Sequence, residues 1–343
     1  MKDKVSKISK GWVADQKNNF SGVLTVFNLD EILFNQTSGL RNKSEELPNT
    51  TDTAFAMASG TKLFTGIAVC KLIESGKLAI DTLLHDVVKH DLGQIDKRVT
   101  IRHLLTHTSG IGDYIDEDVD DMDELLEALY AKYPPHLWTS MEYYLQMTIN
   151  LPPKFAPGER YAYSNSGYVL LGLVVEAVSG KSYQRFVMDE IITPLNLTHT
   201  GFYRSDKLPA NTAFGYLEDG RTNVHSLPIH GGSDGGLYSC AADLNKLWRA
   251  IFTGNVLGVE MLEAFLAPHI EIGTDDDESV ESYGFGVYRY TVGDRKVHFA
   301  VGGDSGVGFL TAYYPHNNVS VSCFSNTGWL GFYGLLKSLL DVD

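Results

Sequence analysis

Cysteines, basic residues and long apolar runs are all scarce in this chain of 343 residues. The 3 cysteines, Cys70, Cys240 and Cys323, lie far apart among apolar or small neighbours. This spacing argues against a disulfide framework and against a Cys-x-x-Cys redox or zinc site, and it predicts buried thiols. No run approaches the roughly 18–20 apolar residues of a membrane helix, so we expect no membrane partner.

Charge of one sign dominates the composition. The chain has 28 Lys and Arg residues against 43 Asp and Glu residues, a net charge of −15. Such a chain repels phosphate backbones and anionic lipid, so we expect no nucleic-acid partner. Residues 1–11 alternate lysines with polar residues and lack the apolar segment of a secretory signal, which predicts a cytoplasmic protein.

The hydrophobic pattern predicts an α+β protein with two lobes. A hairpin is expected over 20–39 and a helix over 63–72. Further helices are expected in the middle of the chain at 84–89, 99–106, 121–132, 140–149 and 167–179. The last third is expected to hold a helix at 243–253, strands at 286–292, 296–301, 309–314 and 319–325, and a helix at 332–340. The simplest packing is one antiparallel sheet flanked by terminal helices. A mainly helical domain (84–234) is inserted into an α/β domain formed by 1–83 and 235–343.

The first candidate for chemistry is Ser59-Gly60-Thr61-Lys62, at the start of the helix expected over 63–72. Residues at i and i+3 share a helix face, so the Ser59 hydroxyl can contact the Lys62 amine. A serine hydroxyl is a weak nucleophile that needs a base, and a lysine can serve when burial lowers its pKa. The alternative is that Ser59 only caps its helix while Lys62 lies in solvent.

A second candidate, Tyr163-Ser164-Asn165, follows about a hundred residues later. A tyrosine beside a charged lysine is expected to have a lowered phenol pKa and to relay protons to and from the serine. The Asn165 amide can hold Lys62 and donate to a substrate carbonyl. Alternatively, Tyr163 only packs on the helix expected at 167–179, with Asn165 as its N-cap.

Together with other stretches, these motifs resemble the serine β-lactamase and penicillin-binding-protein superfamily. The similarity is to the class C β-lactamase branch, which also includes DD-peptidases and esterases. The matching stretches run in family order and comprise Ala58-Ser-Gly-Thr-Lys-Leu63, Ile101-Arg-His-Leu-Leu-Thr-His-Thr-Ser-Gly110, Pro157 to Tyr168, Leu170-Leu-Gly172, Pro194-Leu-Asn-Leu197, Gly235-Gly-Leu-Tyr-Ser239 and Asp243-Leu244. The resemblance implies a β-lactamase/transpeptidase-like fold.

The resemblance also implies an acyl-enzyme mechanism without a metal or an organic cofactor. By position, Ser59 is the nucleophile, Lys62 activates it and Tyr163 shuttles protons. Asn165 contacts Lys62 and the substrate. Which of Lys62 and Tyr163 is the formal base stays open. The Ser59 backbone N–H is expected to form an oxyanion hole with an N–H from a strand that carries a third motif.

This third motif departs from the family pattern. Relatives carry Lys-Thr-Gly or His-x-Gly, whereas here residues 299–309 put Val301 or Gly302 at the cationic position. Gly303 or Asp304 is expected to supply the second oxyanion N–H. Because no cationic side chain is left to bind a carboxylate, we expect neutral esters or amides to be better substrates than β-lactams or peptides.

A run of nine carboxylates between Asp113 and Glu127 contains no basic residue. Its simplest interpretation is a solvated loop or helix face, as for the shorter cluster Asp275-Asp-Asp-Glu278, and not a calcium site. We also hypothesise that the longer run forms part of a lid that disfavours anionic substrates. Tyr114, within it, is either a residue that lines the site or a surface aromatic.

Three further patterns match known motifs in composition but not in context. Gly231-Gly-Ser-Asp-Gly235 fits the G-x-S-x-G elbow without its strand and helix. Gly303-Asp-Ser-Gly306 is similar to the nucleophile loop of trypsin-like proteases, but the chain lacks their two-barrel pattern. His103 and His107 have the spacing of helical zinc ligands, yet Thr108-Ser-Gly110 ends the helix at once and favours a structural turn.

We therefore predict a serine hydrolase that acts on small esters or amides, as a monomer or weak homo-oligomer. The alternative within the same mechanism is a β-lactamase or D-amino-acid peptidase. The alternative from another class is a catalytically silent binding protein on the same scaffold. The altered third motif favours the silent protein, whereas the intact Ser59, Lys62, Tyr163 and Asn165 favour the enzyme.

Overall fold

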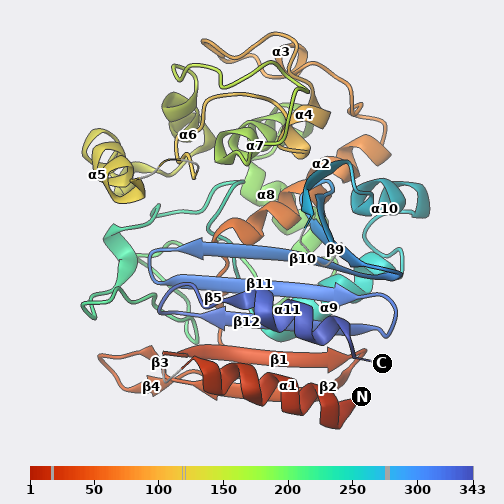
Figure 1. Ribbon diagram of the computed structural model, residues 1–343. Coiled ribbons are helices and arrows are strands. Elements are labelled where there is room, and N and C mark those ends of the chain that lie inside the picture. The colour runs from red at the N-terminus through yellow and green to blue at the C-terminus, as the bar shows by residue number, and fades with distance from the viewer. Residues whose placement is uncertain (17–18, 118, 120, 275–278, 343) are drawn as a thin grey trace.

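The computed structural model describes residues 1–16, 19–117, 119, 121–274 and 279–342. One lobe contains an eight-stranded sheet whose neighbouring strands pair antiparallel (Figure 1). In spatial order the strands are β2 (Glu31–Ser38), β1 (Gly22–Asn28), β12 (Val319–Ser325), β11 (Val307–Tyr314), β10 (Arg295–Asp304), β9 (Tyr288–Val292), β8 (Val280–Tyr283) and β7 (Ile270–Thr274). The shorter acidic cluster, 275–278, lies outside the described residues.

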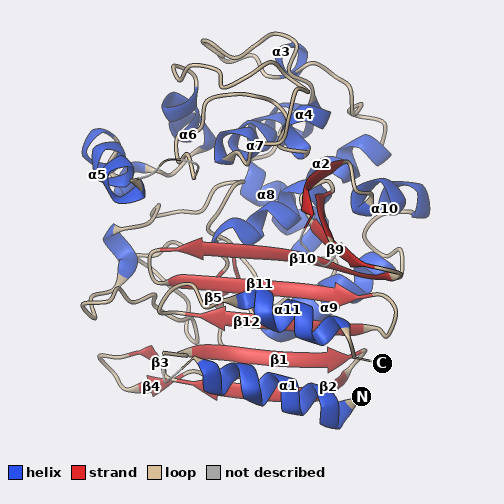
Figure 2. Ribbon diagram, viewed as in Figure 1, coloured by secondary structure: helices blue, strands red, loops and turns tan. Residues whose placement is uncertain are grey.

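The helices divide between the two faces of the sheet and a second lobe. They are α1 (Lys2–Asp15), α2 (Thr61–Glu74), α3 (Leu84–Val87), α4 (Ile101–Leu105), α5 (Met122–Lys132), α6 (Met141–Thr148), α7 (Asn165–Ser179), α8 (Tyr183–Val187), α9 (Ala241–Phe252), α10 (Val259–Leu266) and α11 (Phe332–Leu340). Figure 2 shows α3 to α7 gathered beyond one edge of the sheet, whereas α1 and α11 lie across one of its faces.

Alternation of side chains along the strands builds two hydrophobic cores, one on each face of the sheet. In β1, Leu24 and Val26 face α1 and α11, whereas Val23 and Phe27 join the core that contains α2, α7 and α9. Because β1 pairs with β12, segments from the two ends of the chain are neighbours in one sheet. The helical lobe is thus inserted in the chain between the segments that form the sheet. Both ends of the chain are needed to complete this sheet.

The predicted α+β architecture is confirmed, and the structure adds further elements. Helix α1 was not predicted, because its buried stripe consists of only Val5, Ser9 and Trp12 among lysines. Helices α8 and α10 and strands β7 and β8 were not predicted either, since each of them is only 4 to 8 residues long. The domain boundaries at 83/84 and 234/235 stay a prediction.

Shorter elements complete this part of the fold. They are β3 (Leu40–Asn42), β4 (Leu47–Pro48), β5 (Phe55–Ala56), β6 (Tyr238–Ser239) and the 3₁₀ turn η1 (Ala58–Gly60). β5 pairs with β6 and leads directly into η1 and α2. All three cysteines are buried and free, as expected from their spacing.

Replacing Trp12 with Ala should destabilise the fold by about 3 kcal/mol or more, because large-to-small changes of buried aromatics have that cost. Trp12 stacks on Phe332 with 5.9 Å between ring centroids and meets Phe20 edge-on at 6.0 Å. Chemical denaturation monitored by circular dichroism measures the change. Val259→Ala, at a side chain that is 71% exposed, is the control and should change stability little. A Trp12→Ala protein as stable as the wild type would contradict this packing.

Candidate active site

Ser59 lies in the turn η1, where α2 begins and strand β10 approaches most closely. A Cβ atom added to Gly302 would lie 2.9 Å from the Ser59 backbone nitrogen and 2.2 Å from the Met57 carbonyl oxygen. Such separations leave no room for a side chain, so β10 can reach the nucleophile only with glycine at this position. This close approach explains why the third motif keeps Gly302 although its cationic residue is missing.

The Lys62 amine is buried and makes three hydrogen bonds. Only 2% of the residue is exposed. Its Nζ lies 3.1 Å from Ser59 Oγ, 2.8 Å from Asn165 Oδ1 and 2.7 Å from the Asp234 carbonyl oxygen. The sequence alternative in which Lys62 lies in solvent is therefore wrong.

These three partners suit a neutral amine that acts as a base. A neutral lysine amine carries two N–H groups and one lone pair. Asn165 Oδ1 and the Asp234 carbonyl can only accept hydrogen bonds, so they take the two N–H groups and leave the lone pair facing Ser59. Burial lowers the pKa of Lys62 below its ordinary value, opposed by the charges of Asp234 and Glu117. Geometry and pKa thus both favour proton transfer from Ser59 to Lys62.

Tyr163 approaches Ser59 from the segment that precedes α7. It lines the same cavity as Ser59, and its ring centroid lies 4.8 Å from Lys62 Nζ. Burial raises the pKa of Tyr163 well above its ordinary value, helped by the charge of Glu117. The expectation of a lowered phenol pKa is therefore wrong, because desolvation outweighs the neighbouring amine. A phenol that keeps its proton is suited to donate it.

Asn165 is the first residue of α7 and not its N-cap. The Ser164 hydroxyl caps the helix by accepting from Gly167, so the Asn165 side chain is available to Lys62. Its Nδ2 donates to the Ile115 carbonyl at 3.1 Å and to Glu117 Oε1 at 3.4 Å. The amide therefore contacts Lys62 as predicted, and its donation to a substrate stays a prediction.

Asp113 fixes the position of this helix start. Its carboxylate accepts the backbone N–H groups of Asn165 at 2.7 Å and Ser166 at 2.9 Å. The interpretation of the whole acidic run as solvated is therefore wrong at Asp113, which is 8% exposed. Other members differ: Asp116 pairs with Lys154, and Asp121 caps α5. Residues 118 and 120 lie outside the described chain.

His107 holds the segment that contains Tyr163 through two hydrogen bonds and a contact between rings. Its Nδ1 accepts the Ser164 N–H at 3.0 Å, and its carbonyl oxygen accepts the Ala162 N–H at 2.9 Å. The ring centroid lies 4.5 Å from that of Tyr163. Burial, followed by the Lys62 charge, lowers the pKa of His107 well below its ordinary value, so the imidazole is neutral with its proton on Nε2. The predicted structural turn thus also positions a candidate catalytic residue.

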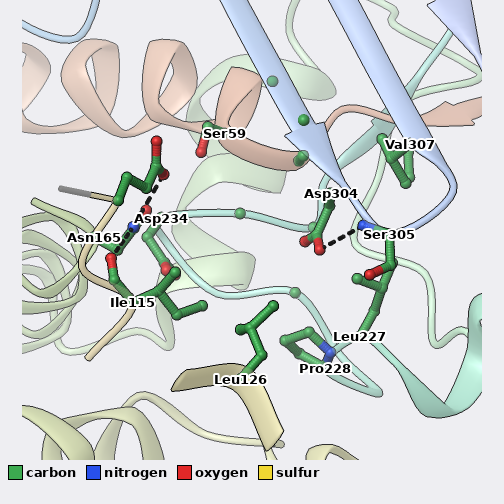
Figure 3. Close-up of a pocket in the computed structure, with 18 of the residues that line it drawn as sticks. Ser59, Ile115, Leu126, Asn165, Leu227, Pro228, Asp234, Asp304, Ser305 and Val307 are labelled. Carbon is green, nitrogen blue, oxygen red and sulfur yellow. Dashed lines mark hydrogen bonds between the residues drawn. The ribbon is translucent and has the colours of Figure 1, made fainter. Parts of the chain in front are cut away.

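The cavity beside Ser59 has a volume of about 620 Å³ (Figure 3). Ser59, Tyr163, Asn165, Gly303 and Asp304 all line it, as expected for site residues, and the structure brings them together with Lys62. Tyr114 lines it too and is not a surface aromatic, since it is 5% exposed and its hydroxyl donates to Asp234 Oδ2. Which of Gly303 and Asp304 supplies the second oxyanion N–H stays a prediction.

The competing motifs have other roles. Ser233, the serine of the G-x-S-x-G match, is fully buried and donates to the Tyr168 carbonyl at 2.7 Å. The same segment contributes the Asp234 carbonyl, which accepts a hydrogen bond from Lys62. No sequence motif predicts this contribution. His103 Nδ1 accepts the Thr100 N–H in a capping box and does not join His107 in a ligand set.

Within the described residues, one group could hold a metal: His199, Cys240 and Asp243, whose ligand atoms lie within 4.8 Å of one another. The Asp243 carboxylate already accepts from the His199 backbone N–H, the Thr200 hydroxyl and Lys246, so we assign the group a structural role. No described helix is both long enough and apolar enough to cross a membrane.

The fold is the β-lactamase/transpeptidase fold, and its cavity brings together a serine, a buried amine and a phenol. The family model described as Beta-lactamase matches residues 10–331, and the chain belongs to this family. The crystal structure of a penicillin binding protein from Bacillus halodurans is 38% identical, with a TM-score of 0.86 over 97% of this chain and 98% of that one.

Two further relatives show different degrees of similarity. Penicillin-binding protein 4* of Bacillus subtilis (strain 168) is 29% identical over 291 residues, which cover 79% of this chain and 60% of that protein. The chain thus matches less than two thirds of that relative's length. A D-stereospecific amidohydrolase from Streptomyces sp. shares the fold, with a TM-score of 0.80 at 23% identity over 98% of each chain.

We expect His107→Asn to keep much of the activity that His107→Gln loses. Asn Oδ1 can replace Nδ1 as acceptor for the Ser164 N–H, and Asn tolerates the positive φ of 56° at this position. Gln places its amide one carbon further out and cannot. kcat/KM of His107→Gln on a chromogenic ester should fall about tenfold below that of His107→Asn. Equal losses in both variants, at equal thermal stability, would contradict the positioning role.

Proposed function

We propose that this chain is a serine hydrolase that forms an acyl-enzyme with small, non-anionic esters or amides. Lys62 takes the Ser59 proton as the oxygen attacks the carbonyl carbon. The negative charge on the carbonyl oxygen is stabilised by the Ser59 backbone N–H and a second N–H from β10. Tyr163 donates its phenol proton to the leaving group, and the proton held by Lys62 restores the phenol. Water then releases the acyl group through the same transfers in reverse order.

The observation that carries this proposal is the set of three hydrogen bonds around Lys62 Nζ. A buried amine is costly to the fold unless its hydrogen bonds are satisfied. Here two fixed acceptors orient the amine so that its third position faces a partly exposed serine in a cavity. A silent binding protein would need the cavity but not this arrangement of serine, amine and phenol.

The substrate preference follows from the residues that line the cavity. Val301 stands at one of the two positions expected to carry the cation, and no described residue that lines the cavity is Lys, Arg or His. Carboxylate-bearing substrates would therefore lack a partner. The second candidate is a penicillin-recognising enzyme, favoured by the name of the Bacillus halodurans relative. The cytoplasmic location and the monomeric or weakly oligomeric state stay predictions.

Labelling tests the proposal directly. A fluorescent fluorophosphonate should label the wild type and Ser233→Ala, whose serine lies in the competing motif, but not Ser59→Ala. A fluorescent penicillin should label the wild type weakly or not at all. Labelling by both probes would support the second candidate, and labelling by neither would support the silent scaffold. Labelling of Ser59→Ala would place the nucleophile elsewhere.

The pH dependence tests which group is the base. Because neutral Lys62 accepts the proton and burial lowers its pKa, kcat/KM should rise with pH. It should level off below about pH 10.4, where free lysine loses its proton. The raised pKa of Tyr163 predicts no decline from phenol ionisation in this range. Initial rates on a neutral ester, corrected with Ser59→Ala as blank, measure the profile. A rate that falls as pH rises from 6 to 9 would contradict Lys62 as the base.

A further inference from the structure

The cavity beside Ser59 has a strongly acidic wall. Glu117, Asp234 and Asp304 all line it, and none of the other described lining residues carries a positive charge. The basic residue Lys62 does not line the cavity, and the hydrogen bonds of its amine go to Ser59, Asn165 Oδ1 and the Asp234 carbonyl. The charge that a substrate meets in this cavity is therefore negative.

Asp304 is placed to contact a substrate that is attached to Ser59. It ends strand β10, two residues after Gly302, and therefore on the same face of the sheet. Two residues of a strand span about 7 Å, so its backbone lies about that far from the point where β10 touches Ser59. Its side chain is exposed to the cavity, and the Ser305 N–H binds Oδ1 at 2.8 Å (Figure 3).

Asp234 adds a second carboxylate with spare hydrogen-bonding capacity. The residue is 6% exposed, and its Oδ2 accepts from the Tyr114 hydroxyl. Its Oδ1 has no hydrogen-bond partner among the described residues. An acidic group this deeply buried is costly unless a positive charge lies near it. Burial raises the pKa of this carboxyl, opposed by Lys62 and by the Tyr114 hydroxyl, so a cationic group of a substrate would favour its ionised form.

Aromatic rings supply an independent reason to expect a cation. Tyr130 and Tyr144 line the cavity near Asp304: burial raises the pKa of both phenols, and the charge of Asp304 contributes to the rise. Further aromatic rings that line the cavity are Trp138, Tyr203, Tyr238, Tyr288, Trp329 and Tyr333. Faces of such rings attract ammonium groups, and they do so most strongly where water is excluded.

We propose that the cavity selects esters or amides that carry a protonated amine, and that Asp304 binds this amine near Tyr130 and Tyr144, with Glu117 and Asp234 adding negative potential. This inference rests on the proposed function and narrows its substrate class. Asp304 occupies the segment in which relatives carry a cation for a substrate carboxylate. This end of the site thus favours a positively charged substrate group, whereas the cation of the relatives favours a carboxylate.

The experiment compares three chromogenic p-nitrophenyl esters of similar length. They are made from 6-aminohexanoic acid (cationic), its N-acetyl derivative (neutral) and adipic acid (a monoester, anionic). Enclosure by the cleft walls, followed by the charges of Asp234 and Glu117, raises the pKa of Asp304 to about 7. Assays at pH 8.5 therefore keep the carboxylate ionised and the amine protonated. The wild type should prefer the cationic to the neutral ester by about tenfold or more, and the anionic ester should be the poorest substrate.

Variants of Asp304 test whether this residue causes the preference for the cationic ester. In Asp304→Asn the ratio of cationic to neutral kcat/KM should fall by about tenfold, and in Asp304→Lys the anionic ester should overtake the cationic one. Glu260→Gln, on an exposed helix far from the cavity lining, removes the same charge and should leave the ratio unchanged. The ratio is measured within each variant, so a loss of folded protein cancels. A wild-type ratio near one, or a ratio that Asp304→Asn does not change, would overturn the proposal.

A binding measurement separates this inference from the proposed function. Ser59→Ala is titrated calorimetrically with 6-aminohexanamide and with its N-acetyl analogue, alone and combined with Asp304→Asn. Tighter binding of the amine that is lost with Asp304 would support the inference even if no ester is hydrolysed. Equal binding of both amides would overturn it even if the phosphonate labels Ser59.

Discussion

The hydrogen bonds of one buried amine, Lys62 Nζ, are the interaction on which the site depends. Their acceptors come from three segments: Ser59 in the turn before α2, Asn165 at the start of α7, and the Asp234 carbonyl in the loop 231–236. Removing an amine from water is unfavourable unless such partners are in place. The same group therefore joins the helical lobe to the sheet lobe and has its pKa lowered by that burial. Stability of this junction and reactivity of the serine have one physical origin.

Around this centre, the structure separates the group that reacts from the groups that select. Lys62 is buried and does not line the cavity, whereas carboxylates and aromatic rings do line it. The segment 299–309 contributes to both functions. Gly302 lets the strand backbone touch the nucleophile, and two residues later Asp304 carries a charge opposite to that expected at a carboxylate-binding site. In the proposed function, this one strand end serves both the reaction at Ser59 and the selection of the substrate.

Much of the fold follows from local patterns. Helices α3 to α7 were predicted within a few residues, because their apolar periodicity is regular and prolines separate several of them. Helix α1 has too short an apolar stripe to be recognised among its lysines, and it becomes stable by packing Trp12 against Phe332 of α11. β7 is short, lies at an edge of the sheet and has no fully buried residue, so its sequence gives only a weak signal. These elements depend on neighbours that are distant in the chain.

The sequence by itself determined that Ser59 and Lys62 share a helix face, because helical geometry sets the i, i+3 spacing. It also pointed to Tyr163 and Asn165, through their motif. Only the tertiary structure decided that a backbone carbonyl at Asp234 completes the partners of the amine, since a carbonyl group is common to every residue and leaves no signal in the sequence. It likewise reversed the expected pKa shift of Tyr163, because desolvation depends on what surrounds the phenol and not on which residues are adjacent in the chain.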